Sequence, residues 1–271
     1  MKKYDLIVIG MGPAGMVAVG MGTKMGLSVL AIEKNAVGGE CLNVGCIPSK
    51  ALLKAAKMVY DLKKLDEVGV RINGDVQIGD PLKIIREKIA SQTGESLNNK
   101  FSAAELLIQE GPASFVDENT IEVDGKQYQS DLIFIATGTE PMIPPIEGLS
   151  EVEYLTNINV FNLKEIPKRL TIIGGGFIGV EMAQAFSRFG SQVTIVHMDD
   201  QLIPSEDQEA SALLAKAFDK EGIAYYNSTM IESVTKNAKG IITKTSAGTF
   251  VSDQLLVATG RKPNIGPLNL D

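Results

Sequence analysis

Short apolar runs alternate with amphipathic stretches along this chain, in the order that is typical of parallel α/β folds. Residues 6–9 are all apolar and predict a buried strand, residues 16–25 predict a helix, and residues 28–32 predict a second strand. The same series returns later, with predicted strands at residues 170–173 and 192–196 on either side of a predicted helix that ends near Phe189. We therefore expect two units that are built on one plan.

A glycine-rich turn joins the first strand to the helix in each copy. One constant offset places Gly10, Gly12 and Gly15 on Gly174, Gly176 and Gly179, and it places Glu33 on His197. Glycines at these positions let the turn tighten and let a pyrophosphate approach the helix N-terminus, while an acid at the end of the second strand accepts ribose hydroxyls. The pattern therefore predicts a dinucleotide site in each unit.

The segments after these motifs also repeat. Residues 113–128 and 223–251 contain short strands that are separated by turn residues, and each set is followed by an apolar strand that ends in Ala-Thr-Gly. The predicted fold class is therefore α/β, with two Rossmann-like dinucleotide-binding domains, each with a parallel sheet and a small inserted antiparallel β-meander. We expect the domains at residues 1–147 and 148–271, joined near residues 141–148, with an insertion at about 37–108 in the first copy only.

Composition limits the possible partners. The chain carries 26 basic and 33 acidic residues, a net charge of −7, which argues against binding to nucleic acid or to an anionic membrane surface. The apolar start of the chain resembles a secretory signal, but Asp5 interrupts it. No apolar run approaches the ~20 residues that span a bilayer. We expect a cytoplasmic protein.

Cys41 and Cys46 are the only cysteines in the sequence. On a regular helix, residues five apart have Cα atoms roughly 8.7 Å apart, beyond the ~6.8 Å that a disulfide tolerates. Either the thiols never pair or the backbone between them departs from a helix. Gly45 and Pro48 provide the freedom and the break that such a departure needs. Two buried apolar thiols and a readily reduced working disulfide both remain open from spacing alone.

With this cysteine motif after the first glycine turn, the chain resembles the class I pyridine-nucleotide flavoprotein disulfide reductases. The segment from Cys41 to Leu53, CLNVGCIPSKALL, is most similar to dihydrolipoyl dehydrogenase, with glutathione and mercuric reductases as nearer relatives. The resemblance covers the whole chain. It implies an FAD-dependent, NAD(P)H-linked oxidoreductase that acts on a small-molecule or lipoyl-type disulfide, and a homodimer.

The resemblance also assigns the cofactor-binding residues. Those expected at FAD are Gly10, Gly12, Pro13, Ala14, Gly15, Glu33, Lys34, Gly39, Lys50, Ala113, Ala136, Thr137 and Gly138. Those expected at NAD(P) are Gly174, Gly176, Phe177, Ile178, Gly179, Glu181, His197, Ile231 and Gly260.

Four residues are expected to be catalytic by the same resemblance. Cys46 is the thiol that faces the flavin, Cys41 is the thiol that exchanges with substrate, and Lys50 and Glu181 form an ion pair beside the flavin and nicotinamide. If they are buried, the carboxylate and the ammonium are tolerated only as a pair, and the alternative for each residue is a solvated surface charge. No metal site is expected.

The chain departs from the family pattern at three points. Glu40 stands where relatives have a small residue, and its carboxylate is expected to raise the pKa of the neighbouring Cys41 thiol. His197 replaces the acid that selects NAD, so we expect either modest discrimination between NAD and NADP or a histidine that merely faces solvent. Family members continue past residue 264 into a further FAD segment and an interface domain that supplies a catalytic histidine.

Two alternatives to a dihydrolipoyl dehydrogenase type of activity remain. One is an activity like that of mercuric or glutathione reductases. The other is an FAD- and NAD(P)-binding fragment that is inactive without the C-terminal domain, because His197 is the one histidine in the sequence and is expected far from the thiols.

Overall fold

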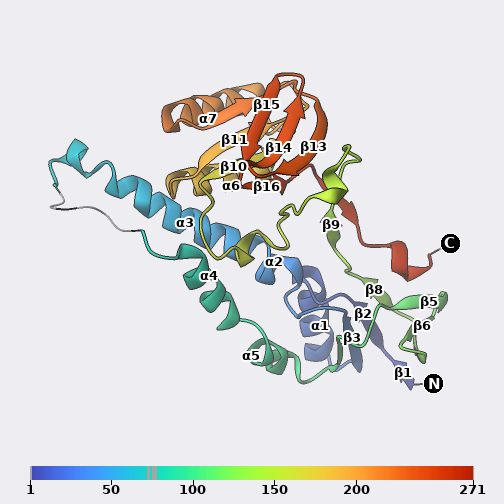
Figure 1. Ribbon diagram of the computed structural model, residues 1–271. Coiled ribbons are helices and arrows are strands. Elements are labelled where there is room, and N and C mark those ends of the chain that lie inside the picture. Colours follow the sequence, from blue (N-terminus) through green and yellow to red (C-terminus); the bar gives the residue numbers. More distant parts are fainter. Residues whose placement is uncertain (1, 72–73, 75–77, 271) are drawn as a thin grey trace. The chain divides into compact units, whose positions relative to one another are not determined.

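The structure is a computed structural model, and it describes residues 2–71, 74 and 78–270. The helices among these residues are α1 (Pro13–Lys24), α2 (Gly39–Asn43), α3 (Cys46–Leu62), α4 (Pro81–Ala90), α5 (Glu95–Asn98), α6 (Phe177–Arg188) and α7 (Gln208–Glu221). The strands are β1 (Lys2–Tyr4), β2 (Leu6–Ile9), β3 (Val29–Glu33), β4 (Glu105–Ile108), β5 (Ser114–Asp117), β6 (Thr120–Val123), β7 (Lys126–Ser130), β8 (Ile133–Ile135), β9 (Thr139–Pro141), β10 (Arg169–Ile173), β11 (Gln192–Val196), β12 (Ala224–Tyr226), β13 (Ile231–Asn237), β14 (Gly240–Thr245), β15 (Gly248–Ser252), β16 (Gln254–Val257) and β17 (Arg261–Pro263) (Figure 1).

The chain forms two compact units. Unit 1 consists of the described residues of Met1–Pro48, Glu87–Glu140 and Lys262–Asp271, and unit 2 consists of those of Ser49–Arg86 and Pro141–Arg261. Both units are therefore discontinuous in sequence. The expected division into domains at residue 147 stays a prediction about which parts fold independently.

A parallel four-stranded sheet forms the centre of unit 1, in the order β4-β3-β2-β8. Alternate residues of β2 point to opposite faces, so Leu6 and Val8 pack with Val19 of α1, whereas Ile7 and Ile9 pack with residues of the strands β6 and β7. Both faces of β2 are thus covered, which explains why this central strand is apolar and buried throughout. The antiparallel strands β5, β6 and β7 form the predicted meander, and β1 pairs in parallel with β7.

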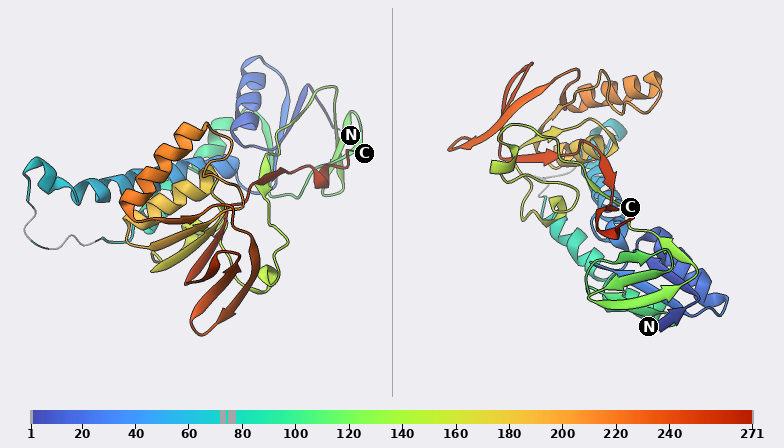
Figure 2. Two further views of the ribbon diagram at one scale, coloured as in Figure 1. Left: turned by 90° about the horizontal axis from the view of Figure 1, so that it is seen from above. Right: turned by 90° about the vertical axis from the view of Figure 1, so that its right-hand side faces the viewer.

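Unit 2 repeats this plan. Its parallel sheet has the order β12-β11-β10-β16, and β13, β14 and β15 form an antiparallel meander. Figure 2 shows α6 and α7 on one side of the parallel sheet and the meander on the other. The predicted α/β fold with two Rossmann-like units is confirmed, and the strands predicted at residues 6–9 and 192–196 have the predicted bounds.

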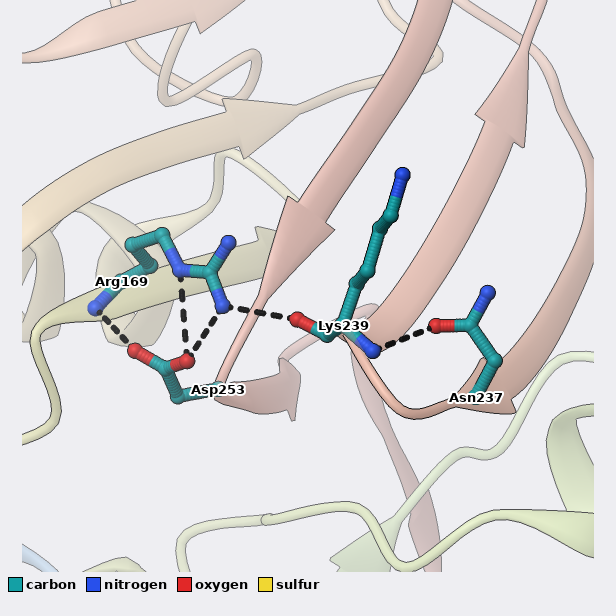
Figure 3. A network of polar contacts seen from close by, with 4 residues as sticks. All are labelled: Arg169, Asn237, Lys239 and Asp253. Carbon is teal, nitrogen blue, oxygen red and sulfur yellow. Dashed lines mark hydrogen bonds and ion pairs between the residues drawn. The ribbon is translucent and has the colours of Figure 1, made fainter.

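A polar network holds the sheet and the meander of unit 2 together at one edge (Figure 3). The guanidinium of Arg169 donates hydrogen bonds to the carboxylate of Asp253 and, over 2.9 Å, to the carbonyl of Lys239. The N–H of Lys239 donates to Asn237 Oδ1 over 2.8 Å. These bonds connect the start of β10 with the β13–β14 turn and with the residue before β16. The Arg169 guanidinium holds the pKa of the Asp253 carboxyl below its usual value.

Two other expected features can be placed. The segment expected to join the domains packs within unit 2, because a Cβ on Gly148 would lie 2.1 Å from the carbonyl oxygen of Val234 in β13. The expected insertion at about 37–108 contains α2 to α5, and its residues 72–73 and 75–77 lie outside the described residues. Among the described helices, none is both long and apolar enough to cross a membrane.

Candidate functional site

The first glycine turn is a tight connection between β2 and α1. Gly10 has a φ of +99°, and a Cβ on it would lie 2.3 Å from the carbonyl oxygen of Ala136. A Cβ on Gly15 would lie 1.8 Å from the Gly10 carbonyl oxygen, whereas one on Gly12 would have only Gly39 Cα at 4.0 Å. Gly10 and Gly15 therefore shape the turn, while the space beside Gly12 is open. Pro13 and Ala14 begin α1, and no side chain of the described residues caps its N-terminus.

Glu33 ends β3 and is buried beside this turn. Its carboxylate accepts hydrogen bonds from the N–H of Met11 and the N–H of Asn35, both over 2.8 Å. Each carboxylate oxygen can accept a second bond, so Glu33 retains capacity for ribose hydroxyls. Lys34, which follows Glu33, is exposed.

Of the remaining residues expected at FAD, Ala136, Thr137 and Gly138 lie against the first glycine turn in unit 1, whereas Lys50 belongs to unit 2. The N–H of Ala136 donates to the carbonyl of Ile9 over 2.7 Å, which brings the Ala-Thr-Gly segment against the glycine turn. Ala113 is buried in the core beneath the meander. Sequence reasoning missed Asn264, whose N–H and side-chain amide donate to the carbonyls of Gly138 and Thr137. Its only sequence signal is its position shortly after the second Ala-Thr-Gly.

The cysteine segment packs directly on the first glycine turn. Gly39, the first residue of α2, has a φ of +55°, and a Cβ on it would lie 2.7 Å from Gly12 Cα. The N–H of Gly38 also donates to the carbonyl of Met11 over 2.7 Å. The only two cysteines of the chain are therefore carried on a segment that abuts a predicted dinucleotide site.

The two cysteines lie on different helices. Cys41 is in α2 and Cys46 is the first residue of α3, because the helix breaks at Val44, which has φ −140° and ψ 11°. The departure from a single helix that a working pair requires is therefore present. Pro48 does not contribute to this break, contrary to expectation, because it lies in the first turn of α3, where a missing N–H costs nothing. Both cysteines are thiols in this structure.

The environments of the two thiols differ. Cys41 is half-buried and Cys46 is exposed. Burial raises the pKa of the Cys41 thiol, and the hydrogen-bonded Cys46 thiol raises that pKa further, while the Cys46 N–H acts in the opposite direction. The sequence predicts this direction from the Glu40 carboxylate, whereas burial and Cys46 are its causes in the structure.

Lys50 and Glu181 form an ion pair within unit 2. Lys50 comes from α3, and Glu181 comes from α6, directly after the second glycine turn. The pair is not buried, because the Lys50 side chain is 62% exposed and that of Glu181 is 32% exposed. The expected pairing of the two residues is thus present, at a position that is exposed to solvent.

The second glycine turn reproduces the first. Gly174 has a φ of +107°, and a Cβ on it would lie 2.3 Å from the Ala258 carbonyl oxygen, while one on Gly179 would lie 2.0 Å from the Gly174 carbonyl oxygen. Gly176 again faces open space, because a Cβ on it would have no described atom within 4 Å. Phe177, at the start of α6, is 55% exposed, and Ile178 follows it on the same helix.

His197 is buried at the end of β11, so the interpretation in which it faces solvent is wrong. Its Nδ1 accepts a hydrogen bond from the N–H of Gly175 over 3.0 Å, as Glu33 does from Met11 at the equivalent place in unit 1. Burial lowers the pKa of His197, which favours the neutral imidazole. Ile231 begins β13 and is partly buried. Gly260 is the glycine of the second Ala-Thr-Gly and has a φ of +124°.

A family model described as pyridine nucleotide-disulphide oxidoreductase matches residues 4–269. A mercuric reductase from Lysinibacillus sphaericus is 35% identical over 273 residues, which cover 99% of this chain and 50% of the relative. A dihydrolipoyl dehydrogenase from Thermus scotoductus is 37% identical over 279 residues, which cover 100% of this chain and 60% of the relative. The chain thus spans about half to three fifths of the length of these relatives.

The solved structures give the same result. The Cu(II) complex of the HOCl-induced flavoprotein disulfide reductase RclA from Escherichia coli superposes with a TM-score of 0.79 at 28% identity, and covers 99% of this chain and 59% of that one. The likeness extends over both units of the chain.

Proposed function

The chain belongs to the pyridine nucleotide-disulphide oxidoreductase family, and from this premise we propose that it carries the FAD site, the NAD(P) site and the reactive thiol pair of a dithiol/disulfide oxidoreductase of dihydrolipoyl dehydrogenase type. One observation carries the proposal. The segment with the only two cysteines of the sequence packs on the first glycine turn, and the close backbone contacts of this turn are repeated at the second glycine turn.

The residues of unit 1 fit FAD. The open space beside Gly12 leaves room for a pyrophosphate at the N-terminus of α1, where backbone N–H groups and the helix dipole favour an anion. Glu33 is buried at the strand end with acceptor capacity for a ribose diol. When bound, FAD would supply two-electron redox chemistry between a nicotinamide and the thiol pair.

The chain's own residues then have distinct roles. Cys46, exposed at the start of α3, is the thiol assigned to the flavin side, and Cys41 is the thiol assigned to exchange with a disulfide substrate. Lys50 and Glu181 form an ion pair within unit 2, and by the resemblance they would act beside the flavin and the nicotinamide.

Two substrate classes are suggested by the two kinds of relative. Dihydrolipoyl dehydrogenases and mercuric reductases match the chain at similar identity. The segment from Cys41 to Leu53, by its resemblance, favours a lipoyl-type disulfide. Assays with dihydrolipoamide and with Hg(II) on the same preparation distinguish the two.

One alkylation experiment tests the redox function and the thiol roles together. The chain is loaded with FAD, oxidised in air, exposed to NADH without oxygen, and alkylated with iodoacetamide before peptide mass spectrometry. We expect both cysteines to become alkylated only after NADH is added, with Cys41 ahead of Cys46, because bound flavin covers the Cys46 side chain that is exposed in its absence.

The FAD-free reduced chain is the control. There Cys46 should react first, since Cys41 is half-buried and burial raises the pKa of its thiol. An absence of new thiols after NADH, in protein that retains FAD, would contradict the redox proposal. An unchanged order of alkylation would instead contradict the two thiol assignments.

A further inference from the structure

Position 197 lacks a free acceptor for a ribose. His197 Nδ1 is occupied by the N–H of Gly175, so the neutral ring presents only the Nε2 side, which in this tautomer is a donor. Nε2 is buried and lies 3.3 Å from Asp199 Oδ2, and the backbone of Gln201 also interacts with the imidazole. Glu33, by contrast, accepts hydrogen bonds from Met11 and Asn35 and still has carboxylate lone pairs that can accept hydrogen bonds from a ribose.

Asp199 stands next to this gap. Its carboxylate is 57% exposed and lies against the buried imidazole, and its backbone carbonyl accepts the N–H of Ser228 over 2.8 Å. The segment also returns to the glycine turn, because the N–H of Ile203 donates to the Gly175 carbonyl over 2.7 Å. Asp199 is thus an anchored acceptor at the carboxyl end of β11, beside the second glycine turn.

The charge around this acceptor has one sign. The segment from His197 to Asp207, HMDDQLIPSED, contains Asp199, Asp200, Glu206 and Asp207 and no lysine or arginine, and residues 226–230 opposite it, YNSTM, contain no charged residue. Asp199 and Asp200 are the charged groups that act on His197. A 2′-phosphate placed here would meet carboxylates and no cation from these segments.

We propose that Asp199 accepts the adenosine ribose hydroxyls at the second dinucleotide site and that this acidic segment makes the site selective for NAD(H) over NADP(H). His197 is then a positioning residue that holds the glycine turn. This inference rests on the proposed function, and it replaces the expectation of modest discrimination, which was based on the histidine at position 197.

Isothermal titration of the FAD-loaded chain with NAD⁺ and NADP⁺ tests the proposal without turnover. We expect NAD⁺ to bind at least about a hundredfold more tightly than NADP⁺, because the 2′-phosphate is repelled at short range. Asp199→Asn should weaken NAD⁺ binding about tenfold and bring the ratio below about tenfold. Glu209→Gln removes one charge at an exposed position of α7, outside this acidic segment, and should leave the ratio unchanged.

The outcomes separate this inference from its premise. Equal or tighter binding of NADP⁺, or a ratio that Asp199→Asn leaves unchanged in protein with an unaltered circular dichroism spectrum, would overturn the assignment while leaving the nucleotide site in place. Failure of the FAD-loaded chain to bind either nucleotide would overturn both this assignment and the NAD(P) part of the proposed function.

Discussion

Glu33 and His197 perform one local task with different chemistry. Each accepts a hydrogen bond from the N–H of the second residue of a glycine turn, which is Met11 in unit 1 and Gly175 in unit 2. The imidazole needs glycine as its neighbour, because a Cβ on Gly175 would lie 2.8 Å from His197 Cδ2. The strand-end residue and the turn residue that it contacts are therefore matched in each unit, as Glu33 with Met11 and as His197 with Gly175.

Burial makes His197 a source of pH-dependent stability. Its pKa is lowered from an ordinary 6.5, chiefly by burial, so the unfolded chain binds a proton more readily than the folded chain. The folded state therefore has its full stability above the unfolded pKa and loses stability as the pH falls below it towards the folded pKa. Protonation of Nδ1 also removes the acceptor that Gly175 requires.

We predict that the free energy of unfolding of the wild-type chain falls between about pH 7.5 and about pH 5.5, and that His197→Asn flattens this dependence. Asn Oδ1 can accept the Gly175 N–H but does not titrate. Urea denaturation at several pH values measures the difference, and no other histidine in the sequence can obscure it. Equal slopes for the two proteins would show that His197 does not titrate on unfolding.

At the residue scale, the sequence predicted where residues lie in the fold better than it predicted the burial and contacts of their side chains. The repeat placed Glu33 and His197 at equivalent strand ends, which the structure confirms. It could not predict which ring nitrogen of His197 faces Gly175, or that the Lys50–Glu181 ion pair is exposed to solvent. Both depend on side-chain packing with residues that are distant in sequence. The cause of the raised Cys41 pKa was misjudged for the same reason, since burial is a tertiary property.

The break between α2 and α3 is the element on which the thiol pair depends. Gly45 occupies it, and a Cβ there would lie 2.9 Å from the carbonyl oxygen of Glu40 and 3.3 Å from Cys41 Cα. Any larger residue must therefore push α3 away from α2, which separates the two thiols.

We predict that Gly45→Ala destabilises the chain by about 1–3 kcal/mol through this overpacking and makes the Cys41–Cys46 disulfide harder to form. Equilibration with glutathione buffers, followed by thiol counting, measures the second effect. Gly79→Ala is the matched control, because Gly79 has no described atom within 4 Å of a Cβ position. A disulfide that forms as readily in Gly45→Ala as in the control would remove the role given to Gly45.

Elements that are buried on both faces were predicted well from their apolar runs. Strands β2 and β11 have the predicted bounds. β2 is apolar throughout, as expected of a strand that is buried on both faces, whereas β11 also contains Gln192 and Thr194. Helix α1 begins at Pro13 rather than at residue 16, since its first turn is made by the glycine turn itself. Pro48 was misread as a helix breaker because a proline in a first turn looks the same in sequence as one that ends a helix.

The whole chain is two copies of one dinucleotide-binding plan, with the thiol pair attached to the first. Gly12 and Gly176 occupy equivalent positions, with extended φ and ψ angles of −72° and −172° and of −74° and −177°. A methyl group fits the protein at both positions, because the nearest described atom is 4.0 Å away for Gly12 and beyond 4 Å for Gly176. Alanine at either position should therefore leave the fold intact and occupy only the space assigned to a pyrophosphate.

The most direct test of two separate sites is calorimetric titration of Gly12→Ala and Gly176→Ala with FAD and with NAD⁺, beside the wild-type chain. We predict that Gly12→Ala weakens FAD binding by at least about tenfold and leaves NAD⁺ binding unchanged, and that Gly176→Ala does the reverse. Wild-type affinity for both ligands in both variants, or a loss of the same ligand from both, would contradict the assignment of FAD to the first turn and NAD(P) to the second.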